Sequence, residues 1–468
     1  MEHKLALERL IEAINNCVDT SEIERIILHP MLNINATFGD VGLRPIHHAV
    51  HKDRIDCVEL FLKYRCNIQL RDKCGFSALH FATRRGNISM MNVLIKRGAD
   101  VHAEDLVGFT PLHIALEKGN SDCTELLLKH GANPNVYYKG LGSEIHILRG
   151  DAPRCLELLL EYGARTASVD VKGLTPLHAA VQSSNIIYTY VLLKHGADPN
   201  AVTSTAGRRK TDTAVGKTSL QIAAIATEPK IMELLLLFGA DSNCRDNHLN
   251  TPLHLAAAHG NIEIMKMLVK NGASVRALNE RSFTPLHRAC SSAPQHMNPE
   301  VLQLLFSYGS YANAFNCYDE TPLHCLLQKS QECLQSEEGQ CTSIREDQFR
   351  EMLLHIINNN ARISITNDPH DMFTILPYMP LIQDFPSIRR LIIEAASSLD
   401  LSLSDDNIPD DLTPELLHHL KEISLKPRSL TWIARNVIRK RMLNLKFESI
   451  NQLQLPTFLK KYVYQLAQ

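Results

Sequence analysis

The chain has 468 residues, a length typical of roughly two to four globular domains or of one long array of repeats. Hydrophobic residues make up 44% of it, which is enough for a packed core and argues against intrinsic disorder. The formal net charge of -2 gives the whole chain no positive excess to attract nucleic acid or an anionic membrane.

The N-terminal segment, MEHKLALERLIEAINNC, is charged and amphipathic, which is not the pattern of a secretory signal. No stretch approaches the roughly 18 consecutive apolar residues of a spanning helix, so we expect no membrane insertion. The 12 cysteines include no CxxC pair, which favours reduced thiols. We therefore expect a cytoplasmic protein, with the nucleus as a second possible location.

One four-residue phrase, Thr-Pro-Leu-His or a close variant, recurs along most of the chain. Successive copies start 33, 33, 33, 32, 43, 33, 33 and 37 residues apart. The nine copies start at Arg44, Ser77, Thr110, Ser143, Thr175, Thr218, Thr251, Thr284 and Thr321. A period near 33 with this phrase is the signature of ankyrin repeats, and the sequence resembles that family from about residue 41 to about residue 400.

Each copy predicts two short helices. Thr or Ser is a good N-cap, and Pro suits the first helical position because its missing N–H is not needed there. Leu112 and Ala115 lie on one face of the first helix. A glycine suits the left-handed residue that ends the second helix. Such glycines are Gly98, Gly131, Gly196, Gly239 and Gly272. One unit cannot bury its apolar face alone, so we predict an all-α ankyrin-repeat solenoid with short β-hairpin loops.

The ends and interruptions suggest the domain boundaries. We predict an N-terminal helical cap or degenerate repeat at 1–40, and the solenoid at 41–400 with nine repeats and a degenerate last unit whose cap residue is Thr374. A linker and helix follow at 401–424, and a small helical domain at 425–466. The copy from Ser143 is the weakest, because it is one residue short between its helices.

Three insertions break the period. The insertion at 201–217 should lengthen one hairpin loop, and the segment at 291–299 should lengthen a turn between helices. The longest, at 328–348, is polar and predicts a mobile loop. Insertions in repeat proteins often gather on the binding face, so these are candidate substrate contacts; the alternative is that they are tolerated surface loops.

No catalytic, metal or cofactor site is predicted. The segment from Thr211 to Ser219 resembles the end of a phosphate-binding loop, but its first glycine is replaced by Thr211 and Thr218 already has a role as a cap. Eight of the 22 histidines are the fourth letter of the repeat phrase, one per unit, which predicts a structural role rather than a shared ion. We find no hydrolase or cysteine-protease signature.

The C-terminal segment from Ser429 to Tyr464 abandons the repeat. Between Lys426 and Lys461 there are nine Lys or Arg and one acidic residue, a local charge of +8. A basic cluster at 439–441 would suit nuclear import or nucleic acid, but it lies in an amphipathic helix. The apolar stripe of that helix contains Leu430, Ile433, Ala434, Val437, Ile438 and Met442. Such a stripe must pack on the last repeat or bind a partner, and we expect no nucleic acid.

This segment resembles a SOCS box. In that family the first half docks on Elongin C and the second half is associated with Cullin-5. The residues that match the Elongin C-binding half are Ser429, Leu430, Ile433, Ala434 and Ile438. Those that match the cullin-binding half are Leu453, Leu455, Pro456, Leu459 and Tyr462. A simple C-terminal cap would not need both spacings together.

Two positions depart from the family pattern. Ala434 replaces a usual Cys, and by analogy with small core truncations the lost sulfur should cost about 1 kcal/mol of binding. Gln454 replaces a usual Pro, which adds some ordering cost on binding. The Elongin C assignment is therefore firmer than the cullin assignment.

Ankyrin repeats followed by this segment resemble the ankyrin repeat and SOCS box family. The resemblance implies a non-catalytic substrate receptor of an Elongin B/C–Cullin-5–RING ubiquitin ligase, whose repeats bind an unidentified protein. The alternative is a scaffold or inhibitor that assembles no ligase, including a nuclear regulator of transcription factors. The resemblance also implies asparagine hydroxylation at Asn135, Asn200 and Asn243.

Overall fold

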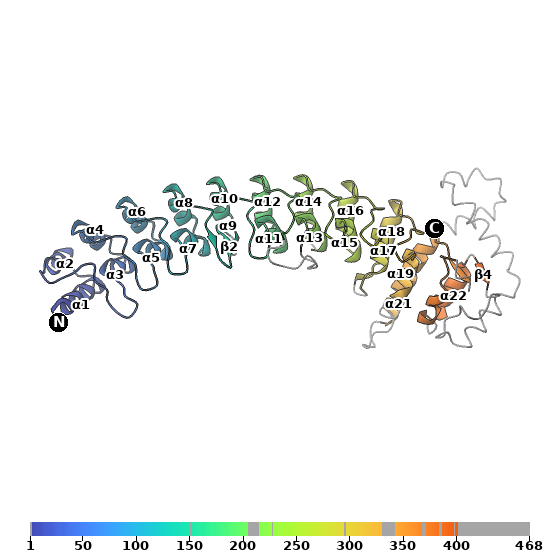
Figure 1. Cartoon of the computed structure of the whole chain (residues 1–468), viewed down its shortest axis with the longest axis horizontal. Coiled ribbons are helices and arrows are strands. Elements are labelled where there is room, and N and C mark those ends of the chain that lie inside the picture. Colours follow the sequence, from blue (N-terminus) through green and yellow to red (C-terminus); the bar gives the residue numbers. More distant parts are fainter. Residues whose placement is uncertain are drawn as a thin grey trace. The chain divides into compact units, whose positions relative to one another are not determined.

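The computed structural model describes most of the repeat region. The described residues are 2–148, 152–204, 215–226, 228–293, 296–329, 342–366, 371–382, 386–396 and 398–400. They fall into two compact units, Met1–Ser219 and Leu220–Gln468, and each is a stack of helix pairs (Figure 1). The predicted all-α repeat fold is confirmed.

The first unit stacks five helix pairs behind an N-terminal pair. The N-terminal pair, α1 (Glu2–Asn15) and α2 (Thr20–Ile27), packs on the pair that follows it. In the lower row of Figure 1 are the first helices, α3 (Pro45–His51), α5 (Ala78–Arg85), α7 (Pro111–Glu117), α9 (Glu144–Ile147) and α11 (Pro176–Gln182). Above them are the second helices, α4 (Ile55–Lys63), α6 (Ile88–Lys96), α8 (Ser121–Lys129), α10 (Pro153–Glu161) and α12 (Ile186–Lys194).

The second unit repeats the arrangement and ends differently. Its first helices are α13 (Ser219–Ile225), α15 (Pro252–Ala258), α17 (Pro285–Cys290) and α19 (Pro322–Gln328). Its second helices are α14 (Pro229–Leu237), α16 (Ile262–Lys270), α18 (Pro299–Ser307) and α21 (Thr342–Asn358). A 3-10 helix, η2 (Leu376–Ile382), then replaces the expected first helix and precedes α22 (Pro386–Ala395). Strands β3 (Ser364–Thr366) and β4 (Ser398–Asp400) pair in parallel, which the sequence did not suggest.

The predicted loop at 328–348 is wrong for its last part, because α21 already begins at Thr342. Phe349, Met352 and Ile356 are fully buried at helical spacing and anchor this helix in the core. The Ser387 hydroxyl donates to Glu346 Oε1 at 2.5 Å and ties the added helical turns to α22. Residues 330–341 of the predicted loop lie outside the described part of the chain.

The predicted helix ends are confirmed. Thr110 Oγ1 accepts the backbone N–H of His113 at 3.2 Å, which is the expected cap. Gly98 and Gly131 have φ values of +88° and +87° after the second helix, in the region that L side chains rarely adopt. Leu112 and Ala115 are buried in the core, as their spacing predicted.

Between helix pairs the chain projects as a short loop that we call a finger, and we number the fingers from the N-terminus. In the third finger (103–109), Asp105 Oδ1 accepts the N–H groups of Val107 and Phe109 at 2.8 and 2.9 Å. This turn fixes the loop without long strands. In other fingers the same kind of side-chain oxygen accepts the N–H of the residue four positions later. The residues are Asp72, Asp170, Asp246, Asn279 and Asn316.

Neighbouring fingers touch through their backbones. The Leu106 N–H donates to Cys74 O at 3.0 Å, and the Ser204 N–H donates to Gly173 O at 2.9 Å. At Gly173 a Cβ atom would lie 2.3 Å from Ser204 O, far inside contact distance. Gly173 is therefore required both by its φ of +76° and by the next finger.

These two requirements can be separated by a pair of substitutions. Gly108 has a φ of +95° but no atom within 4 Å of its would-be Cβ, so Gly108→Ala should lose only about 1–2 kcal/mol for the left-handed conformation. Gly173→Ala should lose a further 1 kcal/mol or more, roughly, because the finger backbones must move apart. Urea unfolding of the full chain measures the difference. Equal losses would show that the close finger contact does not matter.

Candidate protein-interaction surfaces

Six of the repeat histidines link their own helix pair to the next. In the second unit, His254 Nδ1 lies 3.1 Å from the Thr251 backbone nitrogen and accepts its N–H. The proton therefore resides on Nε2, which donates to Phe283 O of the following finger at 2.8 Å. Five other histidines make the same two contacts, one with the cap of their own helix and one with a carbonyl of the next repeat. They are His47, His80, His146, His287 and His324. The predicted structural role of these residues is confirmed.

Burial keeps these histidines neutral. It lowers the pKa of His47, His254 and His287 to about 4, because the charged imidazolium would lose its hydration. In the TSLQ copy, Gln221 replaces the histidine and still donates from Nε2 to Asn250 O at 2.9 Å. No group of three or more His, Cys, Asp or Glu side chains is arranged to hold a metal within the described ranges.

The junction between the third and fourth repeats, whose caps are Thr110 and Ser143, departs from this scheme. Tyr138 occupies the place of the finger aspartate, and Glu144 occupies the place of the first helical proline. The Tyr138 hydroxyl donates to Glu144 Oε1 at 2.5 Å and lies 3.2 Å from the Thr110 hydroxyl. His113 does not reach across; its ring stacks on Phe109 at 3.8 Å and meets the Tyr138 ring edge-on at 4.7 Å.

This junction contains a buried acid. Glu144 is 0% exposed, and burial raises its pKa to about 8, so the side chain is largely protonated at neutral pH. Burial, with the neighbouring Glu144, also raises the pKa of Tyr138, which keeps the phenol a hydrogen-bond donor. The second oxygen, Glu144 Oε2, is buried without a hydrogen-bond partner among the described residues. The junction is therefore held by a neutral acid and a phenol.

The first helix of the fourth repeat is also short. α9 has four residues, whereas the neighbouring α7 and α11 each have seven. A cavity of about 530 Å³ lies beside it, against α10, α11 and α12. Its lining includes Ile145, Leu148, Leu156, Pro176, Tyr188 and Leu192. The prediction that the fourth repeat is the weakest agrees with its shortened first helix. Nothing in the sequence indicated the cavity.

The buried acid predicts an unusual pH dependence. The folded-state pKa of Glu144 near 8 exceeds its ordinary value of 4.5, so the unfolded chain releases this proton first as pH rises. The free energy of unfolding therefore falls between pH 4.5 and 8 on account of this group. Glu144→Gln cannot ionise and should be more stable than the wild type at pH 9 by at least about 1 kcal/mol.

Unfolding midpoints of the full chain at pH 5 and pH 9 test this expectation. The control is Glu161→Gln, at an exposed glutamate whose Oε1 lies 3.3 Å from Arg154 Nη1. The wild type and Glu161→Gln should lose stability together between the two values, and Glu144→Gln should lose less. Parallel pH profiles for all three proteins would show that Glu144 is not protonated in the fold.

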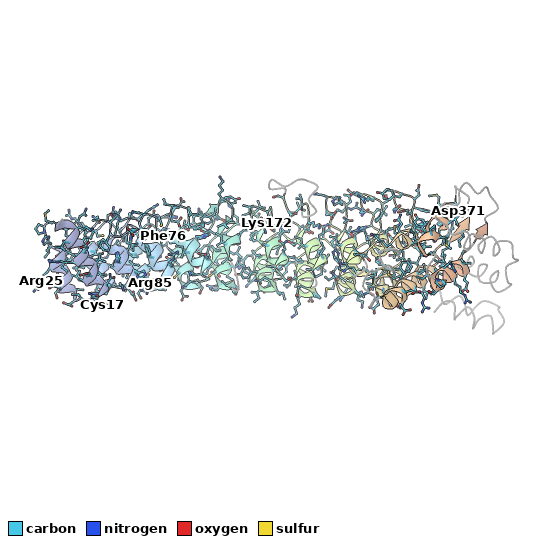
Figure 2. The ribbon with its side chains drawn as sticks, turned by 90° about the horizontal axis from the view of Figure 1, so that it is seen from below. Cys17, Arg25, Phe76, Arg85, Lys172 and Asp371 are labelled. Carbon is cyan, nitrogen blue, oxygen red and sulfur yellow. The ribbon has the colours of Figure 1, made fainter. Side chains whose placement is uncertain are left out.

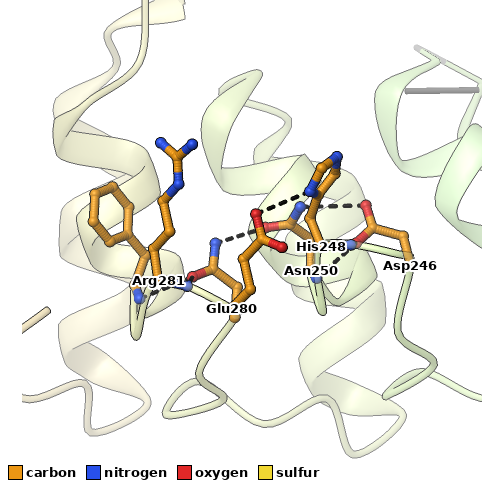
Figure 3. Close-up of polar contacts among 7 residues, drawn as sticks. Asp246, His248, Asn250, Glu280 and Arg281 are labelled. Carbon is orange, nitrogen blue, oxygen red and sulfur yellow. Dashed lines mark hydrogen bonds and ion pairs between the residues drawn. The ribbon is translucent and has the colours of Figure 1, made fainter. Parts of the chain in front are cut away.

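The fingers of the second unit are joined by polar side chains (Figure 3). Asp246 Oδ1 accepts the N–H groups of His248 and Asn250 at 2.9 and 2.8 Å. His248 Nδ1 lies 2.9 Å from Glu280 Oε1 on the next finger. Asn279 Nδ2 donates to Asn250 Oδ1 at 2.9 Å. These contacts cross-link two fingers and satisfy much of their polar surface internally.

Two of the predicted hydroxylation positions have the same geometry. The Asn135 side chain donates to Gly163 O and accepts the Arg165 N–H, both at 2.9 Å. Asn243 makes the equivalent pair of bonds in the second unit, to Gly272 and Ser274. Asn200 lies at the same loop position, where its backbone N–H donates to Asp198 Oδ1.

Sequence reasoning missed a further asparagine of this kind. Asn313 donates to Asn360 O at 2.9 Å and accepts the Arg362 N–H at 2.7 Å. It lies eight residues before the cap Thr321, just as Asn135 lies eight residues before Ser143. That spacing was the available signal.

The predicted Elongin C- and cullin-binding residues lie outside the described part of the chain, so their roles stay predictions. The first set is Ser429, Leu430, Ile433, Ala434 and Ile438. The second set is Leu453, Leu455, Pro456, Leu459 and Tyr462.

Comparison with protein families covers both regions. A family model described as ankyrin repeats (3 copies) matches residues 10–105, 46–138 and 204–279, and a single ankyrin repeat matches 172–204. A model described as SOCS box matches residues 426–463. The chain belongs to the ankyrin-repeat and SOCS box proteins. Both kinds of module are interaction modules rather than catalytic domains.

Three curated proteins are similar to parts of this ankyrin-repeat and SOCS box protein. It is 33% identical over 132 residues to transient receptor potential channel pyrexia of Drosophila melanogaster, covering 23% of this chain and 14% of the channel. It is 35% identical over 98 residues to the B-cell lymphoma 3 protein homolog of Mus musculus, or 20% of each chain.

A third relative is Protein PhlB of Serratia liquefaciens, 33% identical over 105 residues, which are 22% of this chain and 42% of PhlB. The chain thus spans less than half the length of these relatives. None of the described helices has the length and apolar content needed to cross a bilayer.

Proposed function

We propose that this protein is a non-catalytic substrate adaptor of a cullin E3 ubiquitin ligase. The observation that carries the proposal is the presence, in one chain, of stacked ankyrin repeats and a SOCS box match at 426–463. The repeats bind a substrate protein. The SOCS box binds Elongin B/C and then Cullin-5 with its RING partner.

Such an adaptor needs no catalytic residue of its own. Holding a substrate lysine beside a charged E2 enzyme makes the transfer effectively unimolecular, which raises the local concentration of the reacting groups. The requirements on this chain are a stiff body that fixes the substrate and a separate segment that joins the ligase. Within each of the two units, the histidine-linked repeats described above form such a body.

The contact with Elongin C should depend on the apolar stripe that begins at Leu430. Truncation of a buried Leu costs about 2–5 kcal/mol, so Leu430→Ala should weaken binding by roughly thirtyfold or more. Coexpression with Elongin B and Elongin C, followed by size-exclusion chromatography, measures the retained complex. Thr431→Ala, one residue away and off the stripe, is the matched control and should retain it.

Full retention of Elongin C by Leu430→Ala would place the contact elsewhere. Absence of Elongin C from the wild-type protein would contradict the ligase proposal and favour a scaffold or inhibitor. The observation behind that second candidate is the pair of departures at Ala434 and Gln454.

We propose the cytoplasm as the location, with the nucleus as the alternative. The basic cluster Arg439, Lys440 and Arg441 is the feature that would carry nuclear entry. If localisation is unchanged when these three residues are replaced by alanine, a role of this cluster in import is excluded.

Asparagine hydroxylation of the repeats is part of the proposal. Asn200 and Asn243 are exposed, whereas Asn313 is 6% exposed and should be a poorer substrate. Peptide mass spectrometry of the protein purified from eukaryotic cells should find one added oxygen at Asn200 or Asn243 and none at Asn313. Unmodified peptides throughout, or modification at Asn313 alone, would contradict it.

A further inference from the structure

Large apolar side chains are exposed on the third, fourth (136–142) and fifth (168–174) fingers of the first unit. At the tip of the third finger Leu106 is 78% exposed and Val107 is 72% exposed. The two following fingers add exposed apolar side chains at their tips and edges. The six residues, which we call the finger surface, are Leu106, Val107, Tyr137, Leu141, Val169 and Val171. Apolar side chains gathered in this way mark interaction sites more often than scattered ones.

The three fingers are in contact, so the six residues lie on adjoining fingers. The Thr110 hydroxyl behind the third finger lies 3.2 Å from the Tyr138 hydroxyl of the fourth. A Cβ atom at Gly142 of the fourth finger would lie 3.1 Å from the Asp170 Cα of the fifth. In Figure 2, Lys172 of the fifth finger lies along the same long edge of this unit as Phe76, and Arg85 lies toward the other edge.

The charge beside the finger surface is mainly positive. Lys139 and Lys172 are exposed on the fourth and fifth fingers, and Lys73, which donates from Nζ to Asp40 O at 2.8 Å, is exposed on the second. None of the three forms an ion pair among the described residues. The carboxylate of Asp170 is turned into its own loop, where it accepts two backbone N–H groups. Glu104 is the exposed acid of the third finger. Carboxylates on a partner would therefore find cations that are not already neutralised.

Two backbone links are missing at this place. The first and second fingers are joined from the Lys73 N–H to Val41 O, and the second and third from the Leu106 N–H to Cys74 O. Between the third and fourth fingers the Lys139 N–H and Val107 O do not form this bond, and between the fourth and fifth the Val171 N–H and Gly140 O do not form it either. The fourth finger is therefore less tied to its neighbours by backbone hydrogen bonds than the second finger is to the first and third.

The second unit provides the contrast. At the positions of Leu106 and Val107 it has Asn247 and His248 on one finger and Glu280 and Arg281 on the next. His248 and Glu280 contact each other across the fingers (Figure 3). The second unit exposes Leu249, Leu278 and Tyr318, one apolar side chain on each finger, whereas the first unit has two on each of three consecutive fingers.

We propose that the finger surface is the docking site for an extended segment of the substrate protein, with an apolar residue at about every third position and carboxylates between. Packed helices are about 8–10 Å apart, so fingers recur at that spacing. An extended chain in the polyproline II conformation advances about 3.1 Å per residue with three residues per turn, so three residues span one finger and every third side chain faces the finger surface. This inference rests on the proposed function, because it names the class of substrate that the adaptor takes.

The test is selection of random displayed peptides on the purified full chain, followed by fluorescence anisotropy of the enriched peptides. Enriched peptides should show the three-residue apolar spacing with Asp or Glu, and their binding should weaken as salt rises. The double variant Leu106→Ser, Val171→Ser should lower their affinity by at least about tenfold. The matched control is Leu278→Ser, Tyr318→Ser, exposed finger residues of the second unit, which should leave affinity unchanged.

Enriched peptides with helical spacing, affinity unaffected by the Leu106→Ser, Val171→Ser variant, or no enrichment at all would each overturn the proposal. Unchanged unfolding midpoints for both variants verify that the fold is intact. Elongin B/C should still co-purify with the Leu106→Ser, Val171→Ser variant, and Leu430→Ala should still bind the peptides. Failure of the docking site is thus distinguishable from failure of the ligase role.

Discussion

The repeat stacks of both units depend on the hydrogen bond from a buried histidine Nε2 to a backbone carbonyl of the next repeat. His254 to Phe283 O, at 2.8 Å, is its shortest example here. The bond requires a neutral imidazole, since a buried imidazolium is costly, and burial secures this by lowering the pKa to about 4. Because the same histidine also caps its own helix, one side chain fixes the start of that helix, the position of the next finger and the stacking of the two repeats. Gln221 shows that an amide can replace it.

The junction around Glu144 shows what happens when that constraint is released. His113 stacks on Phe109, and a neutral carboxylic acid and the Tyr138 phenol hold the units together in its place. The fourth repeat also has the shortest first helix of the described repeats, and its finger exposes apolar side chains. The regular repeats thus provide stiffness, and the irregular stretch of the first unit provides a distinctive surface. An adaptor needs both, because a substrate must be recognised by something other than the shared repeat.

Much of the fold was predictable because each letter of the repeat has a local role. Cap threonines, first-turn prolines and terminal glycines act within a few residues of themselves, so a single sequence is enough to place them. The helical start of α21 was not predictable, since it depends on burial of Phe349 and Met352 against other elements. The Tyr138–Glu144 pair was also missed, because each residue looked like a simple departure from the repeat. The loop role of Asn313 could have been predicted, because it lies eight residues before the cap Thr321.

The central claim is that the repeats choose a protein and the C-terminal segment delivers it to a ligase. The most direct measurement compares cells expressing the full chain with cells expressing a version that lacks residues 425–468, using proximity labelling and ubiquitin-remnant proteomics together. The account predicts a shared set of labelled neighbours in both, with increased ubiquitination of some of them only in cells with the full chain. The same ubiquitination of those neighbours with and without the segment would contradict it.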